Sequence, residues 1–326
     1  MMRGSASAPQ RATHWADLGE HTFVFGIRVL FWVYRTLGAL PFRLCLYPVI
    51  TYYWATRKAA RQASQDYLRA VHSHSGALGS TPTWRHTFAH FLAFGDAILD
   101  KLLAVSGADP AGGVDVSNDA GLPDALRSGR GAVIVTGHIG CIELCRSVGE
   151  RQDGVRLNVL VHTAHAEQFN RLLHRLNPDS RVQLIQVTEV NPATAIMLAE
   201  KVECGEVIAI AGDRVPVGGG GAVPANFLGA KAMWPMGPYV LAALLKCPLY
   251  AMVCVRPRGQ RGYRLITTCL AERVTLSRKD RVGSAQVHAQ RFASWLETVL
   301  HDAPLAWFNF FPFWQQGMPP GQPHEH

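Results

Sequence analysis

Short apolar runs alternate with longer amphipathic stretches along the chain from residue 131 onward. The short runs predict strands, and the stretches in which apolar residues recur every three or four positions predict helices. The candidate strands are residues 132–136, 156–162, 182–187, 207–211, 249–255 and 263–269, and the candidate helices are residues 141–150, 165–176, 192–204, 237–246 and 285–301. This alternation predicts an α/β fold with a mixed, largely parallel sheet flanked by helices.

The N-terminal part of the chain follows a different pattern. Residues 22–56 are strongly apolar and aromatic, but Arg28, Arg35 and Arg43 interrupt them, and the longest uncharged run, 44–56, has only 13 residues. That run is too short to span a bilayer core of about 30 Å at ~1.5 Å per residue. At helical spacing the three arginines share one face, which predicts a membrane-associated helical segment lying in the membrane plane or shallowly inserted. A partial or tilted span is one variant, and an amphipathic helix pair packed on the protein's own core is the alternative.

Proline and polar residues mark the expected boundaries of helices and domains along the chain. Pro41 is expected to divide the apolar segment into two helices. A further helix is expected within residues 82–105, with His86 and His90 on its surface, because no carboxylate or cysteine joins them as a metal site would require. The predicted divisions are a flexible N-terminus at 1–21, basic apolar anchor helices at 22–75, the α/β domain at 76–315 and a disordered tail at 316–326.

Charge and composition narrow the class of protein. The net charge is +8, and the first 75 residues account for +6 of it, with nine Lys and Arg against three Asp and Glu. Only 17% of the residues are charged and 48% are hydrophobic, which excludes the disordered and fibrous classes. Because the basic excess lies on an apolar segment without a nucleic-acid motif, it predicts contact with an anionic membrane surface and no nucleic acid. Seven cysteines without a Cys-x-x-Cys pair favour a reduced, cytosolic setting.

The strongest candidate for chemistry is the run Gly-Ala-Val-Ile-Val-Thr-Gly-His138-Ile-Gly140-Cys-Ile-Glu143. A buried strand ends, glycines flank a histidine and a helix begins, so we expect His138 at the carboxyl edge of the sheet, where α/β proteins bind ligands. The spacing would let Glu143 hydrogen-bond the imidazole and make it a general base. The start of the helix also offers free backbone N–H groups, and either those near Gly140 or an arginine are candidates for stabilising an oxyanion. The alternative is a structural histidine near the edge of the sheet.

A second run, from residue 206 to 216, also ends with a strand, a glycine and then the pair Asp213-Arg214. If the two strands are neighbours, Asp213 and Arg214 share an edge with His138. The alternative is a capping aspartate and a solvated arginine. The glycine-rich residues 217–223 match neither a phosphate loop nor a dinucleotide fingerprint, and they predict a flexible loop over the site.

Other arginines are candidate anion sites. Arg171 and Arg175 suit a phosphate or a pantetheine phosphate, and the alternative is an ordinary charged helix face. Four arginines between residues 256 and 264 crowd a predicted hairpin turn, which is either a solvated loop or a docking point for an acidic carrier protein. The chain contains no G-x-S-x-G elbow and no complete set of metal ligands, so we expect neither a serine hydrolase nor a metal.

The order of these segments resembles a known family. TYYWATRKAARQASQDYL, GHIGCIE, AGDRVP and NFLGAKAMWPMGPYVLAALLKCP look like the lysophospholipid acyltransferase superfamily, in the branch that contains the late acyltransferases of lipid A biosynthesis. The similarity extends over about residues 15–314. It implies an enzyme at the cytoplasmic face of the bacterial inner membrane that moves a fatty acyl chain from acyl carrier protein, or from acyl-CoA, to a hydroxyl of a lipid or glycolipid. It implies no other cofactor.

The resemblance also implies roles for individual residues. His138 would be the general base and Glu143 the partner that orients it. Asp213 and Arg214 fall where the family has a further active-site acid motif, and Arg171 or Arg175 would bind substrate.

Two segments differ from the lipid A enzymes, which typically carry Asp-Gln at the second motif and Trp-x-His-Arg-Arg-Phe near the C-terminus. Here stand Asp213-Arg214 and, at residues 307–314, WFNFFPFW. This ending looks like the WFNFYDFW of acyltransferases from aryl-polyene and flexirubin pigment gene clusters, and it either packs at the edge of the core or lines an acyl channel. A pigment-type or glycerol-based acceptor is therefore expected. The alternatives are a lipid A acyltransferase proper, a thioesterase-like hydrolase and a catalytically silent lipid-binding scaffold.

Overall fold

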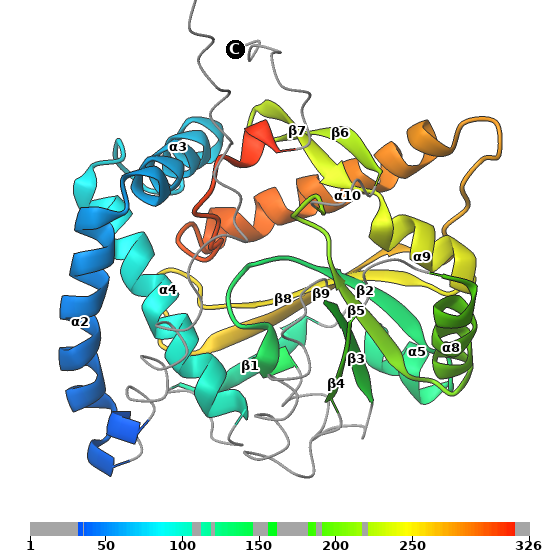
Figure 1. Cartoon of the computed structure of the whole chain (residues 1–326), viewed down its shortest axis with the longest axis horizontal. Coiled ribbons are helices and arrows are strands. Elements are labelled where there is room, and N and C mark those ends of the chain that lie inside the picture. Colours follow the sequence, from blue (N-terminus) through cyan, green and yellow to red (C-terminus); the bar gives the residue numbers. More distant parts are fainter. Residues whose placement is uncertain are drawn as a thin grey trace, which may run out of the picture. The chain divides into compact units, whose positions relative to one another are not determined.

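The computed structural model describes residues 32–34, 36–105, 112–118, 121–145, 156–161, 182–186, 191–216 and 221–316 (Figure 1). The chain divides into two compact units, residues 1–49 and 50–326, and helix α2 (Ala39–Thr56) contains the boundary between them. α2 begins directly after Gly38, which has a positive φ of 88°. Helical residues are also described before Gly38, so the segment is divided as expected, but the break lies at Gly38. Pro41 lies in the first turn of α2, where an N–H has no helical acceptor. None of the described helices is long and apolar enough to cross a membrane.

A seven-stranded sheet forms the centre of the second unit. The five strands that run parallel and the antiparallel pairing of β9 with β8 confirm the mixed, largely parallel sheet. Each of the six predicted strands is present to within two residues, whereas β1, which pairs with β9, was not predicted. The strands lie in the order β1 (Val114–Asn118), β9 (Tyr263–Ala271), β8 (Leu249–Val255), β2 (Ala132–Thr136), β5 (Val207–Ala211), β3 (Leu157–Val161) and β4 (Val182–Gln186).

Helices cover both faces of this sheet (Figure 1). Because side chains alternate along a strand, Val133 and Val135 of β2 pack on one face and Ala132 and Ile134 on the other. This burial on both faces explains why the strands are continuous apolar runs in the sequence. The first face is covered by α3 (Lys58–Ser75), α8 (Pro192–Glu203), α9 (Gly237–Leu245) and α10 (Arg281–Asp302), and the second by α5 (Leu122–Arg127) and the C-terminal end of α4 (Trp84–Val105).

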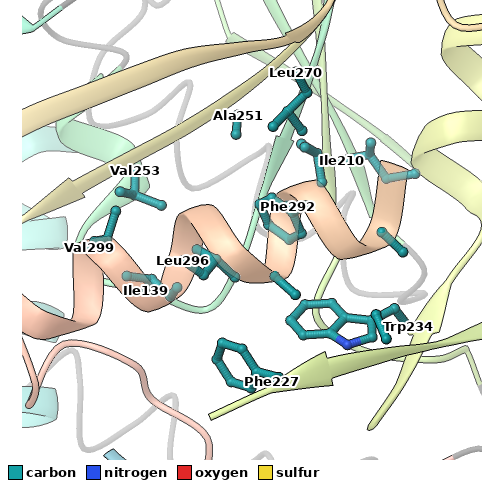
Figure 2. Packing of buried hydrophobic residues seen from close by; sticks show 14 of the residues in the cluster. Ile139, Ile210, Phe227, Trp234, Ala251, Val253, Leu270, Phe292, Leu296 and Val299 are labelled. Atoms are coloured by element: carbon teal, nitrogen blue, oxygen red, sulfur yellow. The ribbon is translucent and has the colours of Figure 1, made fainter. Parts of the chain in front are cut away.

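The larger core lies between α10 and the sheet. Figure 2 shows Phe292, Leu296 and Val299 of α10 between Val253 of β8 and Trp234. Burial of one such side chain stabilises the fold by about 1.5–3 kcal/mol relative to its exposure. This packing holds β2, β5 and β8 in place, and the carboxyl ends of these strands bear the candidate chemistry.

A hairpin of β6 (Ala222–Phe227) and β7 (Ala230–Pro235) packs on α10. Its two-residue turn is Leu228-Gly229, and both residues have positive φ, as a tight hairpin turn requires. The flexible loop expected at 217–223 therefore ends in a strand at Ala222, and residues 217–220 lie outside the described part of the chain.

The predicted helices 192–204, 237–246 and 285–301 correspond to α8, α9 and α10, and the helix expected within 82–105 is α4. α8 begins as the sequence indicates, since the Asn191 side chain accepts a hydrogen bond from the backbone N–H of Thr194 at 2.8 Å. Of the predicted helix 141–150, residues 142–145 are helical, Cys141 directly precedes them, and residues 146–150 are not described. The predicted helix 165–176, the N-terminal residues 1–21 and the tail from 317 onward also lie outside the described residues.

Candidate active site

The candidate site is the turn that follows β2. Two glycines allow the turn to lie closely against its neighbours. Gly140 has a φ of +59°, and a Cβ at this position would lie 2.0 Å from the carbonyl oxygen of Cys254 at the end of β8. A Cβ on Gly137 would approach the carboxyl of Asp213 to 3.1 Å. The backbone between these glycines therefore presents His138 at the carboxyl edge of the sheet, as expected.

β2 and β5 are adjacent and parallel, with Thr136 opposite Ala211. The predicted common edge for His138 and Asp213 is thereby confirmed. The two side chains are in direct contact, since Nδ1 of His138 lies 2.9 Å from Oδ1 of Asp213. A carboxylate accepts hydrogen bonds, so Nδ1 carries the proton in this pair and Nε2 is left with its lone pair. The imidazole remains accessible, with a side chain that is 39% exposed.

Asp213 is almost completely buried, at 1% exposure, and is held by three hydrogen bonds. Besides Nδ1 of His138, its carboxylate accepts from the backbone N–H of His138 at 2.7 Å and from Nε1 of Trp307 at 3.0 Å. Burial alone would raise the pKa of this carboxyl, but His138, its hydrogen bonds and the neighbouring Arg214 hold the pKa well below its ordinary value. Asp213 is therefore a fixed negative charge directed at the imidazole.

The expected hydrogen bond from Glu143 to His138 is not among the contacts of the described residues. Glu143 instead forms an ion pair with Lys101 of α4, with Nζ and Oε1 2.5 Å apart, and it accepts a hydrogen bond from the thiol of Cys141 at 3.7 Å. Burial acts against both charges, yet their mutual attraction lowers the pKa of Glu143 and raises the pKa of Lys101. The expectation was wrong about the contact because residue spacing does not fix which way a side chain turns at the start of a helix.

Two of the backbone N–H groups near Gly140 that were expected to serve an oxyanion donate to carbonyls of the protein. The N–H of Gly140 donates to the carbonyl of Ala306 at 2.8 Å, and the N–H of Cys141 donates to the carbonyl of Cys254 at 2.8 Å. The N–H of Phe308 in turn donates to the carbonyl of His138 at 2.8 Å. These bonds hold the turn between β8 and the C-terminal segment, so Gly140 acts on the shape of the turn rather than as a donor.

Sequence reasoning missed two residues of this site. Trp307 was assigned only a packing or channel-lining role, whereas its indole N–H binds Asp213. His90 was placed on a helix surface, but its side chain is fully buried against residues 307–310. An i, i+4 histidine pair gives no sign of burial by itself. The apolar residues on both sides of His90 were the available signal.

A cavity of about 430 Å³ opens beside the turn. Gly140 and Phe308 are among its lining residues, together with apolar and polar residues of α4, Asp96 included, and residues 303–306. Its size falls in the range of about 300–1,000 Å³ that is usual for small-molecule sites. Arg256 and Arg258, from the hairpin turn expected to be a solvated loop or a docking point, contribute to the lining. Arg256 donates to Asp100 at 2.7 Å and Arg258 to the carbonyl of Ala77 at 2.8 Å, so neither belongs to a freely solvated loop.

Comparison with known proteins identifies the chemistry. A model of the family "bacterial lipid A biosynthesis acyltransferase" matches residues 111–316, more than half of the chain. The chain belongs to this family. It is therefore an acyltransferase, and the match includes both His138 and Asp213. No curated protein sequence matches the chain significantly.

Arg214 of this acyltransferase lies beside the dyad and turns toward the C-terminal aromatic segment. Its guanidinium carbon lies 5.3 Å from the ring centroid of Phe311, and Nη2 is 3.5 Å from the carbonyl oxygen of Phe308. Arg214 thus provides a cation next to the edge that bears His138. Arg171 and Arg175 lie outside the described residues.

Proposed function

We propose that this acyltransferase moves a fatty acyl chain from acyl carrier protein or acyl-CoA to a hydroxyl of a lipid or glycolipid acceptor, with His138 as the general base. The observation that supports this role most directly is the hydrogen bond between Nδ1 of His138 and the buried carboxylate of Asp213. That bond leaves Nε2 as the basic nitrogen of an accessible imidazole. Asp213 then takes the orienting role that the sequence assigned to Glu143.

The proposed reaction is a direct transfer without a covalent enzyme intermediate. Nε2 of His138 takes the proton of the acceptor hydroxyl while the oxygen attacks the carbonyl carbon of the thioester. The tetrahedral intermediate then collapses, the carbon–sulfur bond breaks and the imidazolium returns its proton to the leaving thiolate. The fixed charge of Asp213 stabilises the imidazolium between these two steps, because the carboxylate is ionised at neutral pH.

The other candidate site residues and the cavity have supporting roles in the proposed reaction. Glu143, paired with Lys101, fixes the start of the helix after the turn. Arg214 supplies positive charge for an anionic group of the acceptor or donor, and we keep Arg171 and Arg175 as further candidates for that task. The cavity lined by Gly140, two residues after His138 in the same turn, is the proposed place for the acyl donor.

Replacement of His138 by alanine tests this function. The purified variant is given a labelled acyl thioester of acyl carrier protein or CoA with a lipid hydroxyl acceptor, and acylated lipid and free fatty acid are measured separately. We expect transfer to fall by about 10²–10⁴-fold, the usual contribution of a general base. Normal turnover in His138→Ala would contradict the assignment. If wild-type protein released only free fatty acid, it would be a thioesterase-like hydrolase. Carrier binding without thiol release would identify a silent scaffold.

We propose a pigment-type or glycerol-based lipid as the acceptor, with lipid A as the alternative. The proposal rests on Asp213-Arg214 and on the aromatic ending at residues 307–314. That ending encloses the dyad from the C-terminal side through the Trp307 contact. Lipid mass spectrometry of a strain lacking the gene distinguishes the acceptors, since the lipid class that loses one acyl chain identifies the substrate.

We further propose that the enzyme binds the cytoplasmic face of the bacterial inner membrane through its N-terminal segment. α2 exposes Leu44, Tyr47 and Val49, which are 65%, 45% and 41% exposed. Replacing all three with glutamine should lower the membrane-bound fraction at least about tenfold in a vesicle sedimentation assay, because apolar burial drives such binding. The matched control is the double substitution of Ile196 and Val287, which are also exposed apolar residues. Equal sedimentation of test and control variants would contradict membrane attachment through α2.

A further inference from the structure

We propose that Trp307 is a positioning residue for the His138–Asp213 dyad, and that His90 of α4 holds Trp307 in the place that this task requires. The inference rests on the proposed function only in that His138 is taken as the base. It assigns a specific task to the C-terminal aromatic segment, whose sequence allowed only packing or channel lining. A continuous series of contacts runs from α3 through α4 to the dyad.

The first contact is between Trp307 and Asp213. Nε1 of Trp307 donates to Oδ2 of Asp213 at 3.0 Å, and the same oxygen accepts from the backbone N–H of His138. Two donors on Oδ2 fix the plane of the carboxylate, so that Oδ1 is directed at Nδ1 of His138. Trp307 is completely buried, and a carboxylate held by fixed donors in such a place does not rotate freely.

The second contact holds the backbone of Trp307. The carbonyl oxygen of Trp307 lies 2.8 Å from Nε2 of His90, and Nδ1 of His90 lies 2.9 Å from Oγ of Ser64 on α3. A carbonyl only accepts, so Nε2 of His90 carries the proton and Nδ1 accepts from the serine hydroxyl. Burial lowers the pKa of His90 to about 4, which keeps the ring neutral at physiological pH. His90 therefore stays in the tautomer that the carbonyl of Trp307 needs.

Aromatic packing completes the support. The ring of Tyr67 on α3 lies edge-on to the indole of Trp307, with centroids 5.0 Å apart, and its hydroxyl donates to the carbonyl of Pro304 at 2.8 Å. His90 stacks on Phe310 at 4.8 Å. α3 and α4 thus fix the 304–310 segment at its backbone and at its rings. A displacement of this segment would move the indole N–H away from Asp213.

Trp307→Phe is the decisive variant, because phenylalanine keeps an aromatic ring and lacks the N–H. Trp234→Phe is the matched control. Trp234 is also completely buried and packs edge-on against Phe227, Phe292 and Phe313, and within the described part of the chain its indole nitrogen has no hydrogen-bond partner. Both substitutions remove the same volume from the same aromatic cluster, and only one removes a donor from Asp213.

We expect Trp307→Phe to lower kcat by at least about tenfold with little change in KM, since one hydrogen bond to a charged group is lost. Trp234→Phe should change kcat by less than about threefold. A second readout does not depend on acyl transfer: ¹⁵N NMR of histidine-labelled full-length protein reports the tautomer of His138. Wild type and Trp234→Phe should show the Nδ1–H form, and Trp307→Phe a mixture of tautomers. Identical results for the two tryptophan variants in both readouts would overturn the proposal.

A pair of His90 variants keeps the test decisive if Trp307→Phe does not fold. His90→Gln retains an N–H for the carbonyl of Trp307, whereas His90→Leu does not. Mixed tautomers of His138 in His90→Leu alone would support the proposal, and wild-type spectra in both variants would overturn it. Should His138→Ala remain active, the proposed function fails, while the tautomer measurement still decides whether Trp307 positions the dyad.

Discussion

Two carboxylates flank the turn after β2, the buried Asp213 and the half-buried Glu143, and they differ in the group that they contact. Asp213 accepts a hydrogen bond from Nδ1 of the His138 imidazole, whose Nε2 is the nitrogen proposed to exchange a proton with the substrate. Glu143 faces the ammonium of Lys101, whose pKa is raised further by the pair, so that no proton moves between them at neutral pH. One acid thus belongs to a proton-transfer group and the other to a structural ion pair. The difference shows that adjacent strands, rather than spacing along the chain, decide which acid serves the histidine.

The largest effect should separate the two acids in catalysis. We expect Asp213→Asn to lower kcat by about 10²–10⁴-fold, because an amide at this position can donate to Nδ1 and leave the wrong tautomer of His138. Glu143→Gln keeps a hydrogen-bond partner for Lys101, and its effect on kcat should be at least about tenfold smaller. Both variants are measured with the same acyl donor and lipid acceptor under single-turnover conditions.

The thermal midpoint of each variant provides the control, so that rates are compared per folded molecule. If Glu143→Gln lost as much kcat as Asp213→Asn at an unchanged melting temperature, the comparison would fail. Glu143 would then act on the substrate directly.

The sequence was sufficient for the position of His138 and insufficient for its partner. A buried strand that ends in Gly-His-x-Gly predicts the histidine at the sheet edge. The partner depends on β5 lying next to β2, and that contact joins residues 75 positions apart. The prediction that Asp213 and Arg214 share this edge was conditional on that pairing, which the structure confirms.

Two other differences between the sequence-based expectation and the structure have separate causes. The β6–β7 hairpin was not predicted because its turn places Leu228 at a positive φ, where Asn or Gly is the usual signal. His90 was misplaced because its burial depends on the tertiary partners Ser64 and Trp307, and the apolar residues on both sides of it were a signal for burial but not for these partners.

A smaller effect concerns the stability of the fold in acid. On the Asp213 side of the turn, His90 holds the carbonyl of Trp307, and this histidine should make the folded protein less stable as the pH falls. His90 faces Ser64, Tyr67 and the 307–310 segment, and its folded pKa of about 4 lies below the unfolded value of ~6.5. Between these values the unfolded chain binds more protons than the folded one, so stability falls as the pH drops from ~6.5 to about 4. The loss from this residue amounts to at most about 3 kcal/mol.

Chemical denaturation at a series of pH values measures this loss. His90→Gln cannot titrate, so its stability should change less steeply with pH than that of the wild type between pH 6.5 and 4. The Glu143–Lys101 pair is the same in both proteins, so its own pH dependence cancels from the difference between the two curves. Parallel curves for wild type and His90→Gln would show that the neutral His90 is not what makes this side of the turn acid-sensitive.

The smallest effect concerns the Lys101 side of the comparison. Lys101→Met keeps the length of the side chain and leaves the half-buried Glu143 carboxylate without its partner, so we expect the free energy of unfolding at pH 7 to fall by about 1–2 kcal/mol. The loss should shrink toward pH 4, because Glu143 takes up a proton more readily when Lys101 no longer lowers its pKa. Arg127→Met is the control, since it removes the same charge from an exposed pair with Asp124, and such pairs contribute well under ~1 kcal/mol. An equal loss in both variants, or a loss in Lys101→Met that does not depend on pH, would mean that Glu143 is not held ionised by Lys101. Its role as a structural acid would then have to be abandoned in favour of one that faces the substrate.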